Sequence, residues 1–147
     1  MNKRKSLKEL NLLDKFLFDE AMDDPENVKT MLDIILSQNT NLKQSPQTEK
    51  EQRTSTDNRQ IRLDVYAIDE DDVIYEVEAQ KENTHNLPKR SRLYQGIIDS
   101  KLLPPGVIDF NLLNEVLIVM ITPFDLFGHG LYRYTFQMRC EEVPELK

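Results

Sequence analysis

Apolar and polar residues alternate in two neighbouring segments of the chain, 61–67 and 73–79, and this period of two predicts a β-hairpin. One face of the hairpin is then apolar, and the other carries Arg62, Asp64, Tyr66, Ile68, Ile74, Glu76, Glu78 and Gln80. A three-residue loop, Glu70–Asp72, places Asp64 directly opposite Glu78, whereas a four-residue loop would break that register. The pattern therefore predicts two facing carboxylates.

Apolar residues at the spacing of a helix precede this hairpin in the sequence. Residues 7–22 carry Leu10, Leu13, Phe16 or Leu17, and Met22 at roughly the period of a helix. A second helix begins where Asp24 can act as the N-cap with Pro25 in the first helical position, and its apolar stripe is Val28, Met31, Leu32, Ile35 and Leu36. The polar segment 37–60 that follows is either a long loop or a polar edge strand with turns.

A third helix is expected after the hairpin, opened by Pro88 and running to about Leu102. Its core positions are Leu93, Ile97 and Ile98, while Arg90 and Tyr94 stack at the i, i+4 spacing. Residues 115–121 then form an uninterrupted apolar run, which is typical of a strand buried on both faces. Residues 131–138 alternate again, which predicts one more strand.

This order of elements predicts one α/β domain that occupies residues 1–147, with helices packed on a mixed sheet. Asp64, Glu78 and Gln80 then lie at one end of the sheet, beside the third helix. Directly opposed side chains have Cβ atoms roughly 4.5–5.5 Å apart, so two carboxylates can share one divalent cation, and their hard oxygen atoms suit Mg²⁺ or Mn²⁺. The alternative is an ordinary solvated outer face, on which acidic residues are common.

Composition narrows the choice of function. The net charge of −7 disfavours passive coating of nucleic acid and a role at a membrane surface, but it does not exclude a nuclease, whose metal site needs acids. Cys140 is the only cysteine, which favours a reducing, cytoplasmic location. No apolar segment is long enough to span a bilayer, and no signal peptide is visible.

Several blocks of the sequence resemble a known family. Asp64 followed by Glu78-Ala-Gln80 resembles the active-site signature of PD-(D/E)XK nucleases, in the form found in the PD-(D/E)XK family transposases, also called recombination-promoting nucleases. Further similar blocks occur in family order at residues 13–18, 31–36, 61–66, 87–95, 124–128 and 134–136. The resemblance covers nearly the whole chain, and it implies a restriction-endonuclease-like core and Mg²⁺-dependent cleavage of DNA.

The resemblance also implies roles for individual residues. Asp64 and Glu78 would be the metal ligands, with Asp14 of the first helix completing the metal shell and Glu20 as its rival. Gln80 would take the place usually held by a lysine, orienting a water or a phosphate oxygen without supplying a positive charge. The residues that would contact DNA lie on the third helix and are Arg90, Arg92 and Tyr94.

Some features depart from the family pattern. Phe18 is followed by Asp19 where many relatives carry lysine, and the chain ends soon after the last expected strand, whereas family members continue into a helical region. If that region is missing here, the chain can fold without being active. The other readings are therefore an inactive remnant or binding module on the same scaffold, or a divalent-cation protein that is not a nuclease, and a homodimer is left open.

Overall fold

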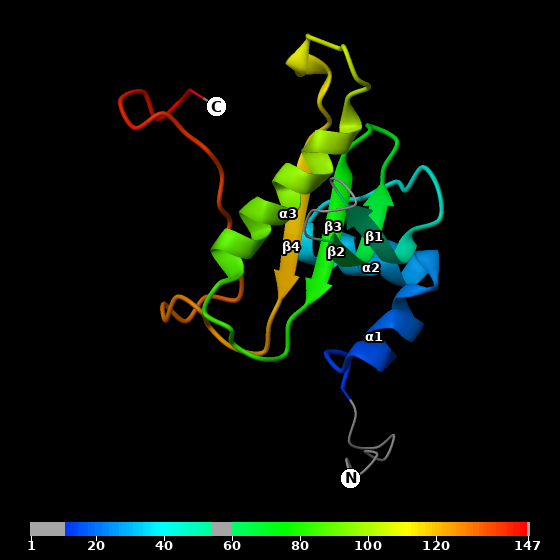
Figure 1. The fold of residues 1–147 in the computed structure, drawn as a ribbon. Helices are drawn as coiled ribbons and strands as arrows, with labels where there is room; N and C mark the ends of the chain where they lie inside the picture. The colour runs from blue at the N-terminus through cyan, green and yellow to red at the C-terminus, as the bar shows by residue number, and fades with distance from the viewer. Residues whose placement is uncertain (1–10, 54–59, 147) are drawn as a thin grey trace.

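The computed structural model describes residues 11–53 and 60–146, and this part of the chain forms a mixed α/β fold (Figure 1). Its three α-helices and four strands form one sheet that lies between two helical layers. The elements are α1 (Lys15–Met22), α2 (Pro25–Leu36), β1 (Gln47–Arg53), β2 (Gln60–Ile68), β3 (Ile74–Ala79), α3 (Leu87–Leu102), the short 3-10 helix η2 (Phe110–Leu112) and β4 (Val116–Ile121).

The two N-terminal helices differ in how well their starts were predicted. Residues 7–10 of the expected first helix lie outside the described residues, and α1 begins only after Asp14. Asn11 and Asp14 instead accept hydrogen bonds from backbone N–H groups in a turn, and such local bonds compete with the helix. The start of α2 is as predicted, with Pro25 in the first turn and the Asp24 carboxylate accepting from the Glu26 N–H at 3.0 Å.

The sheet has the order β1-β2-β3-β4, and the predicted hairpin is its centre. Strand β2 pairs antiparallel with β3 in the register Val65 opposite Val77, which is the register that a three-residue loop requires. Asp72 closes that loop with a φ of 61°, the left-handed conformation expected at its last position. The polar segment 37–60 contains β1, which pairs antiparallel with β2, and β4 runs parallel to β3.

Each face of the sheet is covered by a different helical layer. On one face, α1 and α2 pack against the hairpin through a buried set: Phe18, Met22, Val28, Leu32, Val65, Ala67, Tyr75 and Val77. On the other face, α3 packs against a second set: Leu63, Tyr66, Ile74, Tyr94, Ile97 and Ile98. Figure 1 shows α3 in front of the sheet and α2 behind it. The layout places the carboxyl end of β3 between the start of α1 and the start of α3.

Further sequence predictions about α3 and the later strands fail in this fold. Leu93 was expected in the core of α3 but is 41% exposed. Residues 131–138 do not form a strand, and β4 is only half-buried along its whole length because it lies at the edge of the sheet.

Among the described residues, no helix is long and apolar enough to cross a membrane.

Candidate functional site

The candidate site lies where β2 separates from β3. The ladder between these strands ends at the pair Val65 and Val77, one step before the expected pair of Asp64 and Glu78. Beyond that point the Asp64 carboxylate, rather than a backbone carbonyl, accepts the hydrogen bond from the Ala79 N–H at 3.2 Å. A side chain thus completes the end of the ladder, and it fixes Asp64 beside the last residues of β3.

Separation of the strands also changes which way the residues of β2 face. Alternation predicts Leu63 on the face of Val65, yet Leu63 packs with the α3 cluster. Asp64 in turn contacts α1, through an ion pair of 3.1 Å between its Oδ1 and the Lys15 Nζ. Asp64 is therefore bound by α1 and Glu78 by α3, rather than both lying on one face as strict alternation predicts, but Asp64 is near enough for its charge to raise the pKa of Glu78.

Glu78 and Gln80 are held together by Arg90 from the first turns of α3. The Arg90 guanidinium forms an ion pair with Glu78 and donates to the Gln80 Oε1 at 2.6 Å. Its Nε donates to the Tyr94 hydroxyl at 3.0 Å, and the guanidinium lies 5.2 Å from the centre of that ring. The predicted i, i+4 contact is thus confirmed, and these four side chains form one network.

Glu76 belongs to the same cluster, although the sequence analysis did not single it out. It is completely buried, and neither of its carboxyl oxygens has a hydrogen-bond partner among the described residues. Burial raises its pKa well above the ordinary value, and the nearby Glu78 charge raises it further. The sequence feature that could have identified Glu76 is its spacing from Glu78, because residues two apart share one face of a strand, and this strand is central in the sheet.

The pKa of Glu78 is raised to about 6, as expected for a carboxyl group facing other acids. Burial is the largest cause, the Asp64 charge is the next, and the Arg90 guanidinium opposes both. The side chain of Glu78 is only 3% exposed, and its second oxygen, Oε1, has no hydrogen-bond partner among the described residues. Glu78 therefore keeps one buried oxygen in a position where a proton or a cation would be stabilised.

Asp14 lies close to this cluster, whereas its rival does not. Asp14 forms an ion pair with Lys81, the residue directly after Gln80, and is only 15% exposed. Glu20 is exposed. Lys15 bridges the candidate site to α1, because its Nζ contacts both Asp64 and Asp19. Of the two acids on the first helix, the structure brings only Asp14 to the end of β3.

Arg92 is the one predicted DNA-binding residue that stands apart. It is exposed on α3, two residues beyond Arg90, and within the described residues it forms no ion pair with the carboxylates that Arg90 contacts. Its position on the open side of the helix leaves it available to a ligand outside the cluster. The network at the end of the sheet therefore contains Arg90 and Tyr94 but not Arg92.

The oxygen atoms of the cluster suit a hard cation better than a soft one. No group of three or more His, Cys, Asp or Glu side chains within residues 11–53 and 60–146 has the geometry of a metal site. Mg²⁺, however, is commonly held by one or two carboxylates together with waters and substrate phosphates. Asp64 and Glu78 fit that requirement, since Glu78 has a buried oxygen without a partner.

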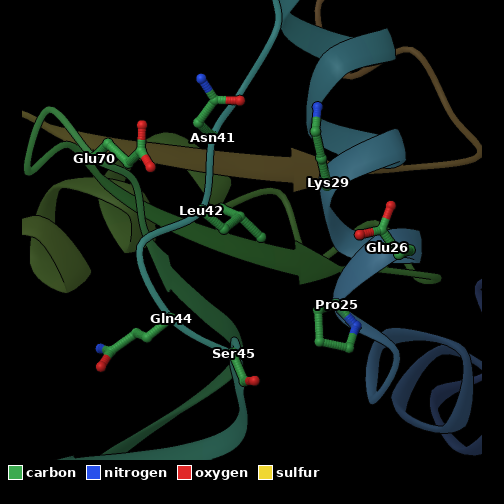
Figure 2. Close-up of a pocket in the computed structure, with 8 residues that line it drawn as sticks. All are labelled: Pro25, Glu26, Lys29, Asn41, Leu42, Gln44, Ser45 and Glu70. Atoms are coloured by element: carbon green, nitrogen blue, oxygen red, sulfur yellow. The ribbon is translucent and has the colours of Figure 1, made fainter.

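A separate hollow of about 590 Å³ lies at the opposite end of the hairpin (Figure 2). Residues of α2 face the segment 41–45 across it, and Glu70 of the hairpin loop closes one side. Its lining consists of Pro25, Glu26, Lys29, Asn41, Leu42, Gln44, Ser45 and Glu70. None of the residues predicted to act in catalysis or DNA binding belongs to this hollow.

Comparison of the chain with protein-family models, with curated proteins and with solved structures finds no match in any of the three.

The raised pKa of Glu78 predicts how stability depends on pH. A carboxyl group that holds its proton more tightly when folded makes the protein less stable as pH rises from its ordinary value of 4.5 through about 6. The free energy of unfolding should fall by about 2 kcal/mol over this range on account of Glu78. Urea unfolding at pH 4.5 and pH 7 measures the change.

Glu78→Gln should remove this part of the pH dependence, because glutamine does not ionise. Glu20→Gln is the matched control, since Glu20 is an exposed acid away from the cluster. An equal slope in wild type and Glu78→Gln would show that Glu78 titrates as an ordinary solvated carboxylate.

Proposed function

We propose that this chain is a metal-dependent DNA endonuclease of the PD-(D/E)XK transposase kind. The observation that carries the proposal is the assembly of Asp64, Glu78 and Gln80 at one end of a mixed sheet, with Glu78 buried and one of its oxygens unpartnered. The mixed sheet between two helical layers is compatible with the restriction-endonuclease-like core that the sequence resemblance implies. A cytoplasmic location, with access to DNA, belongs to the same proposal.

In this proposal Asp64 and Glu78 would hold Mg²⁺ or Mn²⁺, and Asp14, the N-cap residue of α1, would support the site. When bound, such a cation lowers the pKa of a coordinated water and polarises the scissile phosphate. Asp64 is prepared for this role because the Ala79 N–H and Lys15 fix its two oxygens. Gln80, held by Arg90, presents an uncharged amide that can orient a water or a phosphate oxygen.

The basic residues around the cluster supply the positive charge that a phosphodiester needs. Arg90, Lys15 and Lys81 each pair with an acid of the cluster, from α3, α1 and the end of β3 respectively. A guanidinium can hold a phosphate through two parallel hydrogen bonds, so Arg90 is suited to contact the DNA backbone once a cation neutralises Glu78. Tyr94 orients Arg90, and Arg92 offers a second contact farther along the helix.

Divalent cations should therefore stabilise the fold. A cation that binds only the folded chain adds about 2.7 kcal/mol at a concentration 100 times its dissociation constant, which raises the melting temperature by several degrees. Mg²⁺ and Mn²⁺ should stabilise the protein and support nicking of supercoiled DNA, whereas Ca²⁺ should stabilise it with little turnover. Thermal unfolding in each salt, with Glu78→Gln as the control, measures the effect. The absence of a shift with all three ions would contradict a metal site at Asp64 and Glu78.

One observation favours a second candidate, an inactive remnant or binding module on the same scaffold. Glu78 is paired with Arg90 and Asp64 with Lys15, so the acids already have basic partners without a cation. Such a network can stabilise one end of the sheet with no chemistry. A chain that melts identically with and without Mg²⁺, and leaves plasmid DNA intact, would fit this candidate.

A further inference from the structure

Strand β4 leaves one side of the sheet open. Among the described strands it pairs only with β3, and its sequence, Val-Leu-Ile-Val-Met-Ile, contains no charge and no proline. The Ile74 N–H donates to the Glu115 carbonyl and the Gln80 N–H to that of Ile121, so the odd-numbered residues bond to β3. In a parallel ladder the even-numbered residues, Val116, Ile118 and Met120, then direct their N–H and C=O groups to the open side.

The opposite edge of the same sheet is formed by a polar strand. Strand β1 has the sequence Gln-Thr-Glu-Lys-Glu-Gln-Arg, and charged residues on an edge strand discourage pairing with other chains. A long apolar edge without such residues, by contrast, favours the addition of another strand. The sequences of the two edges therefore make β4 the edge better suited to accept another strand.

Residues 131–138 have the pattern of a strand but no sheet to join. Tyr132, Tyr134, Phe136 and Met138 alternate with more polar residues, and Tyr132 and Met138 are almost completely exposed. In the described structure, no backbone-to-backbone hydrogen bond involves residues 132–140. Figure 1 shows the chain turning away from the sheet after β4. An open edge and an unpaired strand-like segment thus occur in one molecule.

The segment is anchored to its own chain by side chains alone. Arg133 donates to the Ile35 carbonyl at the end of α2, at 2.7 Å. The Tyr134 hydroxyl donates to Asp125 at 2.8 Å, and Asp125 also accepts from the Gly130 N–H at 2.6 Å. The Leu131 N–H donates to the Tyr134 hydroxyl at 3.3 Å, and the backbone N–H and C=O groups of residues 132–138 form no bond with another backbone group in the described part of the chain.

We propose that two copies of this chain form a dimer in which residues 131–138 of each copy add as a strand to the open edge of β4 in the other. The exchange is symmetric, so each copy both provides and receives a strand. The even-numbered apolar side chains of the added strand would extend one apolar layer of the sheet, and the odd-numbered polar ones would lie on its other face.

Ile118→Pro tests the edge directly. Proline removes the outward N–H of residue 118 without removing a hydrogen bond to β3, and proline is tolerated on edge strands. Ile118→Ala is the matched control, because it loses the same packing against α3 but keeps the N–H group. In sedimentation velocity or light scattering, wild type and Ile118→Ala should reach twice the 17.3 kDa mass of one chain as concentration rises, and Ile118→Pro should stay at one chain.

Substitutions that introduce charge test the donated segment, residues 131–138. Tyr132→Lys with Met138→Lys should abolish the dimer, because both side chains would enter the apolar layer, whereas Gln137→Lys on the other face should retain it. A wild type that stays monomeric at all concentrations would overturn the proposal. So would a dimer unaffected by the Ile118→Pro and lysine variants, or concentration-independent protection of residues 131–138 from hydrogen exchange, which would mean that the segment joins its own β4.

Discussion

Glu78→Gln should abolish metal-dependent cleavage of DNA while leaving a folded protein. The substitution removes a charged ligand from a buried position at the end of β3, and a metal-stabilised transition state loses several kcal/mol with it. We therefore expect the cleavage rate to fall at least about a thousandfold. The amide has the shape of the protonated acid, so the fold should survive, and relief from the repulsion by Asp64 should make it more stable at neutral pH.

Nicking of supercoiled plasmid, followed alongside urea unfolding, separates the two effects. Glu20→Gln should match wild type in both assays, because Glu20 is exposed on α1. Cleavage at the wild-type rate by a purified Glu78→Gln chain would exclude Glu78 as a metal ligand.

Arg90→Met should destabilise the fold by about 3–5 kcal/mol, because it leaves a buried carboxylate without its cation. Glu78 is 3% exposed, and Glu76 beside it is fully buried, so no solvent replaces the lost guanidinium. Gln80 and Tyr94 lose hydrogen-bond partners at the same time. Chemical denaturation near pH 8, where Glu78 is ionised, measures the loss.

Two further variants serve as controls for this prediction. Arg92→Met, on an exposed position of the same helix, should change stability by less than about 0.5 kcal/mol. The double variant Arg90→Met with Glu78→Gln should recover part of the loss, because the uncompensated charge is gone. Equal losses for Arg90→Met and Arg92→Met would show that the pair with Glu78 contributes little.

The hairpin was predictable from the sequence because its register depends on local features. The loop Glu70–Asp72 is bounded by alternating apolar residues on both sides, and a shift of one residue would turn every buried side chain outward. The register of Val65 opposite Val77 follows. The start of α2 was equally local, since the Asp24 cap and Pro25 act within one turn.

Features that depend on neighbouring strands could not be predicted in the same way. Leu63 changes face because β2 leaves β3 at Asp64, and the alternation of a single strand contains no sign of that separation. Glu76 appeared to be one more acid on a polar face. It becomes a buried carboxyl group only because β2 and β4 flank it and α3 covers that face, which are all contacts distant in sequence.

The segment 131–138 shows the limit of periodicity itself. An alternating pattern indicates which side chains would share a face, but a strand also needs a partner for its backbone groups. In the single chain, Asp125 and the Ile35 carbonyl bind its side chains, and residues 132–138 form no backbone-to-backbone hydrogen bond in the described structure. The alternating pattern therefore predicted a strand that the single chain does not form, and the proposed dimer is based on that same pattern.

Nicking of supercoiled plasmid by the wild-type chain and by Asp64→Ala, in Mg²⁺ and in EDTA, tests the proposed function most directly. Asp19→Ala is the control, because Asp19 is the other carboxylate partner of Lys15 but is not a candidate ligand. We predict nicking by wild type and Asp19→Ala in Mg²⁺, and none by Asp64→Ala or by any chain in EDTA. Intact plasmid with the wild-type chain in both Mg²⁺ and Mn²⁺, or nicking by Asp64→Ala at the wild-type rate, would contradict the proposal.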